Sequence, residues 1–209
     1  MYPDKTQQEA SIWFDLFPES SRQLVHAGQT LFRTGDPVDH VILIESGAVA
    51  EVRQDDGVTH ASCLCHAGML VGVRWSGFGS FVHATEAVAL VETTIRSIPL
   101  DTFTRANRED GRYAHMMLAD MAKRVDSARR LTDCLAQNSA RDHVLSVLRA
   151  IAEEFGSDQH GHSQIAIPAH LLQRLTGCPR STLGSAINDL MINGVVHADL
   201  RGIQLIGRI

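Results

Sequence analysis

Residues 166–196, AIPAHLLQRLTGCPRSTLGSAINDLMINGVV, contain two short amphipathic patterns separated by a glycine. The first pattern places Leu171, Leu172 and Leu175 on one helical face. The inner face predicted for the second consists of Leu183, Ile187, Leu190 and Met191. Between them Gly177 permits a positive φ, and Pro179 suits the first turn of a helix. Two helices joined in this way are typical of a helix-turn-helix.

The outer face of the second predicted helix carries polar side chains of the kinds that contact phosphates and base edges. They are Arg180, Ser181, Thr182, Ser185 and Asn188. The following segment, VVHADLRGIQLIGRI, predicts a strand, a turn and a strand, which would form a wing with Arg201 near its tip. Arg201 is either a phosphate contact or an ordinary exposed arginine. The pattern as a whole predicts a DNA-reading unit.

Charge is distributed unevenly along the 209 residues, which carry a net charge of −5. Residues 1–105 hold 13 acidic and 7 basic side chains, 106–167 hold 9 and 8, and 168–209 hold 2 and 4. The overall charge argues against a protein that coats nucleic acid without specificity. Phosphate binding would therefore depend on well-placed groups in a dimer rather than on a general basic field.

The four cysteines, at positions 63, 65, 134 and 178, lack the density and spacing of a secreted disulfide scaffold. The sequence shows neither a signal peptide nor an apolar run long enough for a membrane span, and its first 14 residues resemble a leading helix. We therefore expect a soluble protein of the reducing cytoplasm.

Residues from about Gln29 to Ile98 form short β-branched or alternating runs separated by turn residues, which predicts a compact β-barrel or roll. Residues 101–137 hold no proline, and a long helix is expected there. A heptad seam runs along it through Ala114, Leu118, Met121, Val125, Ala128, Thr132 and Leu135. The seam predicts a parallel two-helix dimer contact; the alternative is packing against the helix's own domain.

A second helix is expected from about Ala140 to Phe155, with Val144, Leu145, Leu148 and Ile151 buried. A polar, turn-rich stretch at 156–164 follows and predicts a surface loop. His160 and His162 within it could suggest a metal, but no Cys or carboxylate stands at ligand spacing, so we expect no metal site.

The order of a β-rich sensor, a long heptad helix and a winged helix-turn-helix resembles the Crp/Fnr family of bacterial transcription regulators. The strongest local matches are LFRTGDPVDHVILIESGAVAEV at 31–52 and LTGCPRSTLGSAINDLMINGVV at 175–196. The resemblance implies an α+β chain with a cyclic-nucleotide-binding-like β-roll (double-stranded β-helix or jelly roll) at 1–105, a dimerisation helix at 106–138 and a winged helix-turn-helix at 139–209. It also implies a cytoplasmic homodimer on a two-fold DNA site, and RNA polymerase as a partner if the protein is an activator.

The phosphate cassette of the family's cyclic AMP receptors is not retained. Those proteins carry a Gly-Glu pair and, after a loop, an Arg-Ser pair; here Gly72 is followed by Val73, and Phe81, Val82 and His83 occupy the Arg-Ser region. Because a buried phosphate needs a cation or several donors, cyclic AMP is not the expected effector. The residues expected at an effector pocket are Val73, Arg74, His83, Ala128 and Arg129.

The segment Cys63-Leu64-Cys65-His66 leaves the cofactor undetermined. On a strand the two cysteines share a face, where they could be a redox pair, part of a haem or metal site, or small buried residues. Haem lined by His66, Trp75 and His83 is one possibility, whereas the clustered N-terminal cysteines of the family's iron–sulfur members are absent.

Arg180 stands where the family has an arginine that contacts bases or phosphates, and a bidentate contact to guanine is expected of it. Ser181 and Ser185 replace a common Glu and Arg, which predicts a different or looser DNA target with more shape readout. The leading hypothesis is a homodimeric DNA-binding transcription regulator controlled by an effector other than cyclic AMP, or by none. The alternative is a haem- or redox-sensing interaction protein with a structural helix-turn-helix. No catalytic constellation indicates an enzyme.

Overall fold

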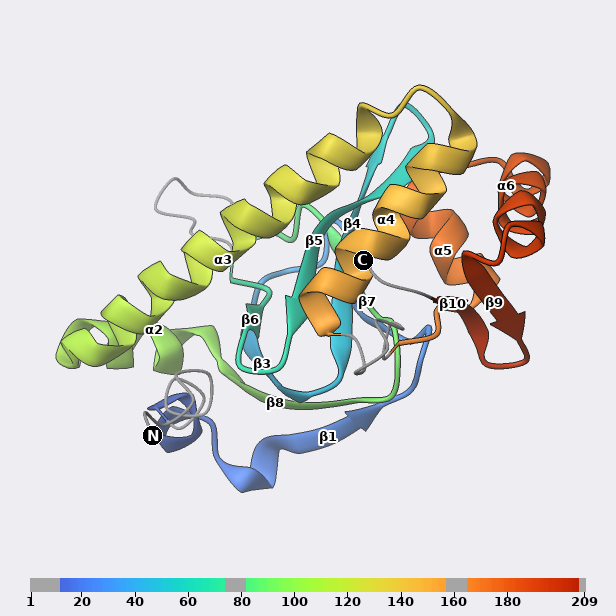
Figure 1. The fold of residues 1–209 in the computed structure, drawn as a ribbon. Helices are drawn as coiled ribbons and strands as arrows, with labels where there is room; N and C mark the ends of the chain where they lie inside the picture. The colour runs from blue at the N-terminus through green and yellow to red at the C-terminus, as the bar shows by residue number, and fades with distance from the viewer. Residues whose placement is uncertain (1–11, 74–81, 157–164, 207–209) are drawn as a thin grey trace, which may run out of the picture. The chain divides into compact units, whose positions relative to one another are not determined.

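The computed structural model describes residues 12–73, 82–156 and 165–206 (Figure 1). Within these ranges the chain forms two compact units. Unit 1 contains the described residues up to 51 and those from 65 to 125; unit 2 contains residues 52–64 and those from 126 onward. The three-part division at 105 and 138 stays a prediction.

Two four-stranded sheets form the β-roll. One has the strand order β1 (Arg22–Val25), β8 (Thr93–Pro99), β3 (His40–Ser46), β6 (Leu70–Val71), and its neighbouring strands pair antiparallel. The other has the order β2 (Thr30–Phe32), β7 (Glu86–Ala89), β4 (Ala48–Asp55), β5 (Val58–His66). The strands begin at Arg22, earlier than Gln29, after a 3₁₀ turn at Glu19–Ser21.

The turn between β4 and β5 has the chemistry of a two-residue hairpin. Asp56 and Gly57 both have positive φ angles, of 49° and 80°. Two successive residues with positive φ match the right-handed twist of the strands, and Asp-Gly is a favoured pair for such a turn. The predicted Asp-Asp-Gly turn is therefore confirmed, and it ends a hairpin whose tip belongs to unit 2.

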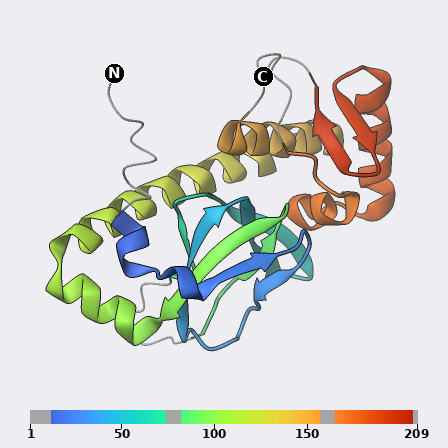
Figure 2. The same ribbon diagram turned by 90° about the horizontal axis from the view of Figure 1, so that it is seen from below.

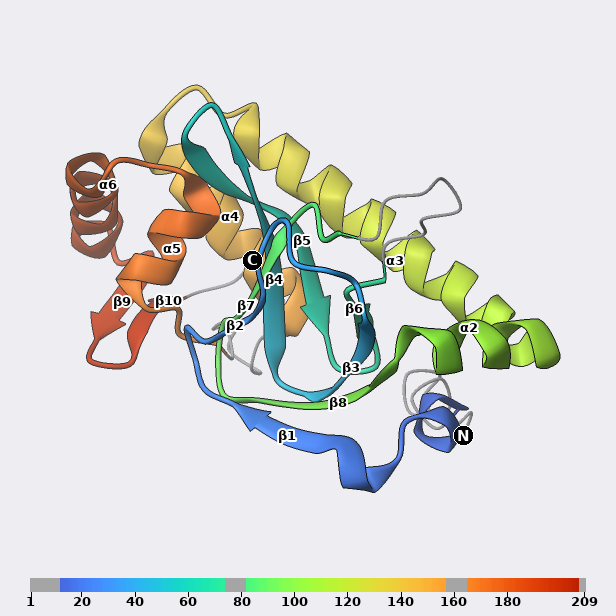
Figure 3. The ribbon, with the colours of Figure 1, turned by 180° about the vertical axis from the view of Figure 1, so that it is seen from behind.

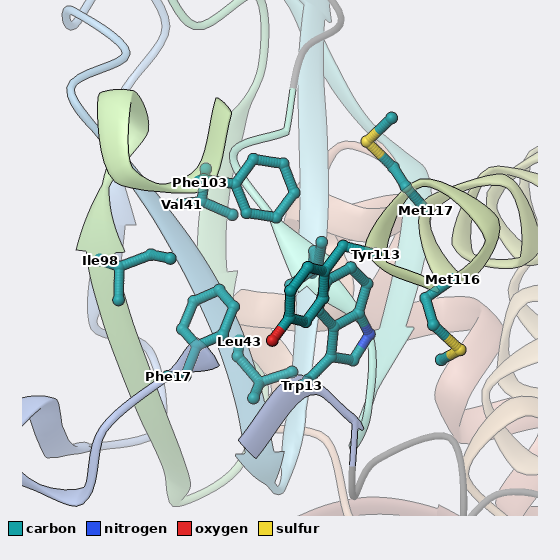
Figure 4. Packing of buried hydrophobic residues seen from close by; sticks show 10 residues of the cluster. Trp13, Phe17, Val41, Leu43, Ile98, Phe103, Tyr113, Met116 and Met117 are labelled. Carbon is teal, nitrogen blue, oxygen red and sulfur yellow. The ribbon is translucent and has the colours of Figure 1, made fainter. Parts of the chain in front are cut away.

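An aromatic cluster forms the core of unit 1 (Figure 4). The Trp13 ring stacks on Tyr113 with centroids 6.0 Å apart and meets the edge of Phe17 at 6.3 Å. Residues 12–16 are helical; the rest of the predicted leading helix lies outside the described residues. The cluster joins the leading segment, β3 and the helices after β8, through Val41, Leu43, Leu70, Ile98, Phe103, Met116 and Met117.

The helix predicted at 101–137 is broken. The structure has α2 (Leu100–Glu109) and α3 (Gly111–Leu135), separated by Asp110 in extended conformation, with φ −130° and ψ 109°. The Asp110 carboxylate accepts a hydrogen bond from the Arg112 amide at 2.9 Å. An aspartate is a favoured helix N-cap, and its side chain satisfies an amide that has no intrahelical partner. The Asp110-Gly111 pair therefore starts a second helix at a place where the uninterrupted periodicity predicted a single continuous helix.

The α3 face that packs against the chain's own core is not the predicted heptad seam. Tyr113, Met117, Ser127, Leu131 and Cys134 are buried. The seam residues lie on another face: Leu118, Val125, Thr132 and Leu135 are exposed and Ala114, Met121 and Ala128 are half-buried. The alternative in which the seam packs on its own domain is therefore wrong for the exposed positions.

Unit 2 is mainly helical. Helix α4 (Ala140–Phe155) has the predicted bounds, is capped by the Ser139 side chain, and buries Val144, Leu145, Leu148 and Ile151 as expected. After residues 157–164, which lie outside the described residues together with His160 and His162, come α5 (Ala169–Thr176) and α6 (Arg180–Ile192). Strands β9 (Val196–Asp199) and β10 (Gly202–Leu205) then pair antiparallel (Figure 2) and form the predicted wing.

Candidate nucleic-acid interface

The turn between α5 and α6 requires glycine for two independent reasons. Gly177 has φ +68°, in the left-handed region, and its amide donates to the Gln173 carbonyl at 2.9 Å. A Cβ at this position would lie 2.7 Å from Val58 Cγ1 and 2.9 Å from the Thr59 carbonyl oxygen, at the tip of the β4–β5 hairpin (Figure 3). The turn therefore combines a conformation that favours glycine with a close contact to the hairpin.

The buried face of α6 differs from the predicted one at Ala186, Ile187 and Met191. Leu183, Ala186 and Leu190 are buried, Ile187 is half-buried, and Met191 is 42% exposed. The three buried positions follow steps of three and four, so they lie on one face of the helix. Met191, one residue beyond Leu190, is rotated about 100° away from that face. The prediction that Met191 lies on the inner face is wrong.

The predicted reading residues of α6 face outward. Arg180, Ser181, Ser185 and Asn188 are exposed and Thr182 is half-buried. The Arg180 guanidinium makes no hydrogen bond or ion pair with the described residues, so it remains available to a ligand. The Ser185 hydroxyl donates to the Ser181 carbonyl at 3.1 Å, which ties it to its own helix. Of these side chains, Arg180 is therefore the longest, and its guanidinium N–H groups are available to donate hydrogen bonds to a ligand.

Arg201 lies at the wing tip as predicted, but it has a partner there. Its guanidinium donates to Asp199 Oδ2 from Nε at 3.0 Å and from Nη2 at 2.9 Å, and its amide donates to Asp199 Oδ1 at 2.8 Å. These hydrogen bonds lower the pKa of the exposed Asp199 carboxyl. A phosphate at the wing would compete with this carboxylate for the guanidinium. Sequence reasoning missed Asp199, although its place two residues before Arg201 was a signal.

An ion pair joins α4 and α6. Arg141 Nε lies 2.5 Å from Asp189 Oδ2, and Arg141 Nη1 lies 3.1 Å from Asp142 Oδ1. Both side chains of the interhelix pair are partly exposed, at 38% and 50%. The pair contributes only a small energy to the orientation of α6, because an ion pair with this exposure is screened by water. No spacing in the sequence indicated it.

In unit 1, His83 occupies the space beside Gly72. Its imidazole stacks on Phe32 with centroids 3.7 Å apart, and a Cβ on Gly72 would lie 3.1 Å from His83 Cε1. Burial lowers the pKa of His83, because the charged ring loses solvation, while the carboxylates of Glu51, Asp36 and Asp39 act in the opposite direction. His83 also lines a cavity of about 400 Å³ together with Phe32, Asp36, Asp39 and His40.

Of the other residues predicted at an effector pocket, Val73 belongs to unit 1 and is not among those that line this cavity. Val73 packs against the aromatic cluster of unit 1, and Arg74 lies outside the described residues. Ala128 is half-buried in unit 2, and Arg129 is exposed beside Asp126 at 3.8 Å. Within unit 1, therefore, His83 is the predicted residue that lines a cavity.

Arg124 forms a buried polar network that the sequence pattern did not single out. Its guanidinium donates to Asp120 at 2.9 Å, to Glu51 at 3.0 Å and to the Leu70 carbonyl, while Asp120 also accepts from the Leu70 amide at 3.0 Å. The Arg124, Asp120 and Glu51 side chains are 13%, 3% and 13% exposed. The network fastens α3 to β6 and satisfies both carboxylates, which is the condition under which buried charges are tolerated.

The segment Cys63-Leu64-Cys65-His66 lies on β5 as predicted. Both cysteines are buried and form no disulfide with a described residue, and His66 Nδ1 contacts the Ala67 carbonyl at 2.8 Å. Leu64 is buried as well, so both faces of the strand are covered. Trp75 lies outside the described residues. Among those that are described, no cluster of three or more His, Cys, Asp or Glu side chains could hold a metal ion, and no helix could cross a membrane.

Comparisons with known proteins agree with this architecture. Residues 22–110 match the family model of the cyclic nucleotide-binding domain. The CRP-like protein Clp of Xanthomonas euvesicatoria pv. vesicatoria is 23% identical over 196 residues, covering 85% of this chain and 80% of Clp.

Two solved structures have the same fold. The c-di-GMP responsive global regulator CLP of Xanthomonas campestris has a TM-score of 0.73 and 19% identity, covering 97% of this chain and 99% of that one. FixK2 from Bradyrhizobium japonicum has a TM-score of 0.70 and 17% identity, covering 90% and 92%. The predicted order of β-roll, long helix and winged helix-turn-helix is confirmed, with α3 as the long helix.

Proposed function

We propose that the chain is a homodimeric, sequence-specific DNA-binding regulator of transcription. The proposal is supported by the match of residues 22–110 to the cyclic nucleotide-binding domain and by the likeness to CRP-like regulators. The protein would act in the cytoplasm, with RNA polymerase as a further partner if it activates. No enzymatic family is indicated by its relatives.

The outward face of α6 carries this proposal. Arg180, Ser181, Ser185 and Asn188 are exposed on the second helix of a helix-turn-helix that is followed by a two-stranded wing. In such a unit the second helix enters the major groove with its N-terminal residues at base edges. Arg180 is the first residue of α6, and its unpaired fork suits the O6 and N7 acceptors of guanine.

The heptad seam supports the dimer. On α3 the side chains of Leu118, Val125 and Leu135 are 68%, 49% and 52% exposed in a single chain. Large apolar side chains repeated at heptad spacing on one helix face are stabilised when a second helix covers them. A parallel α3 pair would relate two α6 helices by a two-fold axis, as a palindromic site requires.

The surroundings of Gly72 support an effector other than cyclic AMP, or none. His83 and Phe32 pack beside this glycine, and burial lowers the pKa of His83, so the imidazole is a poor substitute for a permanently charged arginine. The guanidinium of Arg124 is already bound to Asp120, Glu51 and a carbonyl. A cyclic phosphate would have to displace these contacts.

Fluorescence anisotropy with duplexes from upstream of the protein's own gene tests the proposal. We expect at least one duplex to bind more tightly than random DNA of equal length at moderate salt, with two protomers per site. Equal binding to all duplexes would overturn the proposal. Cyclic AMP should leave the affinity unchanged; c-di-GMP is a useful second probe, because the similar X. campestris regulator is described as responsive to it.

The absorption spectrum of the purified protein provides a separate check of the sensor. A colourless protein with selective DNA binding agrees with the proposal. A haem or iron–sulfur spectrum, coupled with no selective binding to any duplex, would instead favour a redox-sensing interaction protein with a structural helix-turn-helix.

A further inference from the structure

His143 holds together the ends of two helices in unit 2. It lies in the first turn of α4, and both of its ring nitrogens contact backbone carbonyl oxygens: Nδ1 contacts Cys134 at 2.7 Å, and Nε2 contacts Thr176 at 2.9 Å. Cys134 is the penultimate residue of α3, and Thr176 is the last residue of α5. The ring therefore bridges the end of the long helix and the residue that precedes the Gly177 turn.

The chemistry of the two partners determines the protonation state that completes this bridge. A carbonyl oxygen is only an acceptor, whereas a neutral imidazole has one N–H donor and one lone pair. A neutral ring can therefore donate to one of the two carbonyls and leaves the other facing its lone pair. Only the imidazolium donates both hydrogen bonds.

The position of the two carbonyls also favours a positive charge. The last four carbonyls of a helix have no partner within the helix, and they form the negative end of its dipole. Both acceptors of His143 belong to such a last turn. A cation between two helix C-termini satisfies two orphan acceptors and interacts favourably with both dipoles, while the positive end of the α4 dipole, where His143 itself is attached, acts in the opposite direction.

Other charged groups around the ring are engaged elsewhere. The Asp142 carboxylate contacts the Ser139 hydroxyl and Arg141, Asp189 of α6 is paired with Arg141, and the Cys134 thiol donates to the Arg130 carbonyl. In the described residues no carboxylate forms an ion pair with His143, so the carbonyls are the groups that respond to its charge. Further ionisable side chains on these elements include Asp126, Arg129, Arg130 and Asp133 on α3, Arg149, Glu153 and Glu154 on α4, His170 and Arg174 on α5, Cys178 in the turn and Arg180 on α6.

We propose that His143 is a proton-binding clasp: protonation of its ring fastens the end of α5 to the end of α3, and loss of the proton releases one of the two ends. The end of α5 leads through Gly177 into α6, so the clasp adjusts how firmly the reading helix is held. The protein would then respond to the gain or loss of one proton at this ring. Its effect on DNA affinity rests on the proposed function; the clasp itself does not.

The state of the ring is measured without DNA, by long-range ¹H–¹⁵N correlation spectra of the full-length protein with ¹⁵N-labelled histidine. His143→Gln identifies the signals of this ring. As the pH is lowered, we expect the ring to change from one protonated nitrogen to two. A ring that stays a single neutral tautomer from about pH 5 to pH 9 would overturn the proposal.

The functional consequence is measured as DNA affinity at about pH 6 and pH 8.5. The loss of affinity on raising the pH should be about fivefold larger for the wild type than for His143→Gln, because one hydrogen bond with a charged donor is lost. His170→Gln, an exposed histidine on α5, is the matched control and should keep the wild-type pH dependence. The same pH dependence in His143→Gln and the wild type would contradict the clasp.

The two ideas can fail separately. A ring that gains its second proton in a protein that binds no duplex selectively would overturn the proposed function and leave the clasp standing. If His143→Gln does not fold, the nitrogen signals of the wild type alone decide, with the ring assigned from its contact with Cys134.

Discussion

Gly177 illustrates how a single residue carries both a turn and a contact. We expect Gly177→Ala to lower the free energy of unfolding by about 2–4 kcal/mol, because a left-handed φ costs an L-residue about 1–2 kcal/mol and the new Cβ meets the hairpin. Chemical denaturation of the purified variant measures the change.

Gly184 is the matched control for that substitution. It lies inside α6, and a Cβ there would meet no atom within 4 Å. Gly184→Ala should therefore raise the stability by up to about 1 kcal/mol through helix propensity. A loss of stability of equal size in both variants would contradict this account of Gly177.

Arg180 is the residue on which base recognition depends in the proposed function. Arg180→Ala should weaken binding to the preferred duplex by about 1–3 kcal/mol and reduce discrimination at one base position. Arg129→Ala, which removes an exposed arginine of α3 with a weak ion pair, is the control and should leave discrimination unchanged. Anisotropy titrations against a set of single-base variants measure both effects. Discrimination that survives Arg180→Ala would exclude this role.

At the scale of elements, the Arg124 network fastens α3 to β6. Replacing Arg124 with methionine would leave two largely buried carboxylates without their cation, so we expect a loss of about 3–5 kcal/mol in unfolding free energy. Arg129 pairs with Asp126, and these side chains are 76% and 62% exposed, so Arg129→Met should lower the unfolding free energy by less than about 0.5 kcal/mol. Urea unfolding curves of the two variants separate these cases, and equal midpoints would contradict the network's role.

The ion pairs at the edge of the first sheet predict that the free energy of unfolding depends on pH in the acid range. A hydrogen bond from Arg96 Nε holds the pKa of Glu45 below its usual value, and the charges of Arg96 and Arg22 add to the effect. Because this pKa is lowered by folding, the contribution of Glu45 is present above its unfolded pKa, about 4.5, and is lost as the pH falls through the folded pKa.

Glu45→Gln should therefore reduce the acid sensitivity of the protein. Between about pH 5 and pH 3 the unfolding free energy of the wild type should fall more steeply than that of Glu45→Gln. Glu92→Gln, at an exposed carboxylate near His26, should follow the wild type. Parallel slopes for the wild type and Glu45→Gln would contradict the assignment.

Periodicity predicted the type of each main helix but not every end. Helix α4 and the two helices around Gly177 follow from apolar spacing, capping residues and a glycine, all of which act within a few residues. The break at Asp110 was missed because periodicity continues across it, while the capping bond to Arg112 depends on the chain turning there. Ala186 was missed as a core residue because its burial depends on what packs against α6.

At the scale of the whole molecule, the exposed seam of α3 predicts the oligomeric state. Leu118→Asp should raise the dissociation constant of the dimer at least about 100-fold. Each protomer loses the burial of one leucine side chain, which is worth about 1.5–3 kcal/mol. The two new aspartates would also repel each other across the interface. Sedimentation velocity over a range of concentrations measures this. Leu24→Asp, at an exposed leucine of β1, is the control and should stay dimeric; a monomeric wild type would refute the seam.

The sequence by itself determined the local features of this protein: the strand-rich first half, the glycine between two short helices, the wing and the apolar seam. These follow from periods of two, three and four residues and from turn chemistry, which neighbouring residues decide. Only the tertiary structure decided which α3 face is buried, that His83 stacks beside Gly72, and that His143 bridges two helix ends. Those contacts join residues far apart in the chain, and their partners are often backbone carbonyls, which every residue carries and no sequence pattern distinguishes.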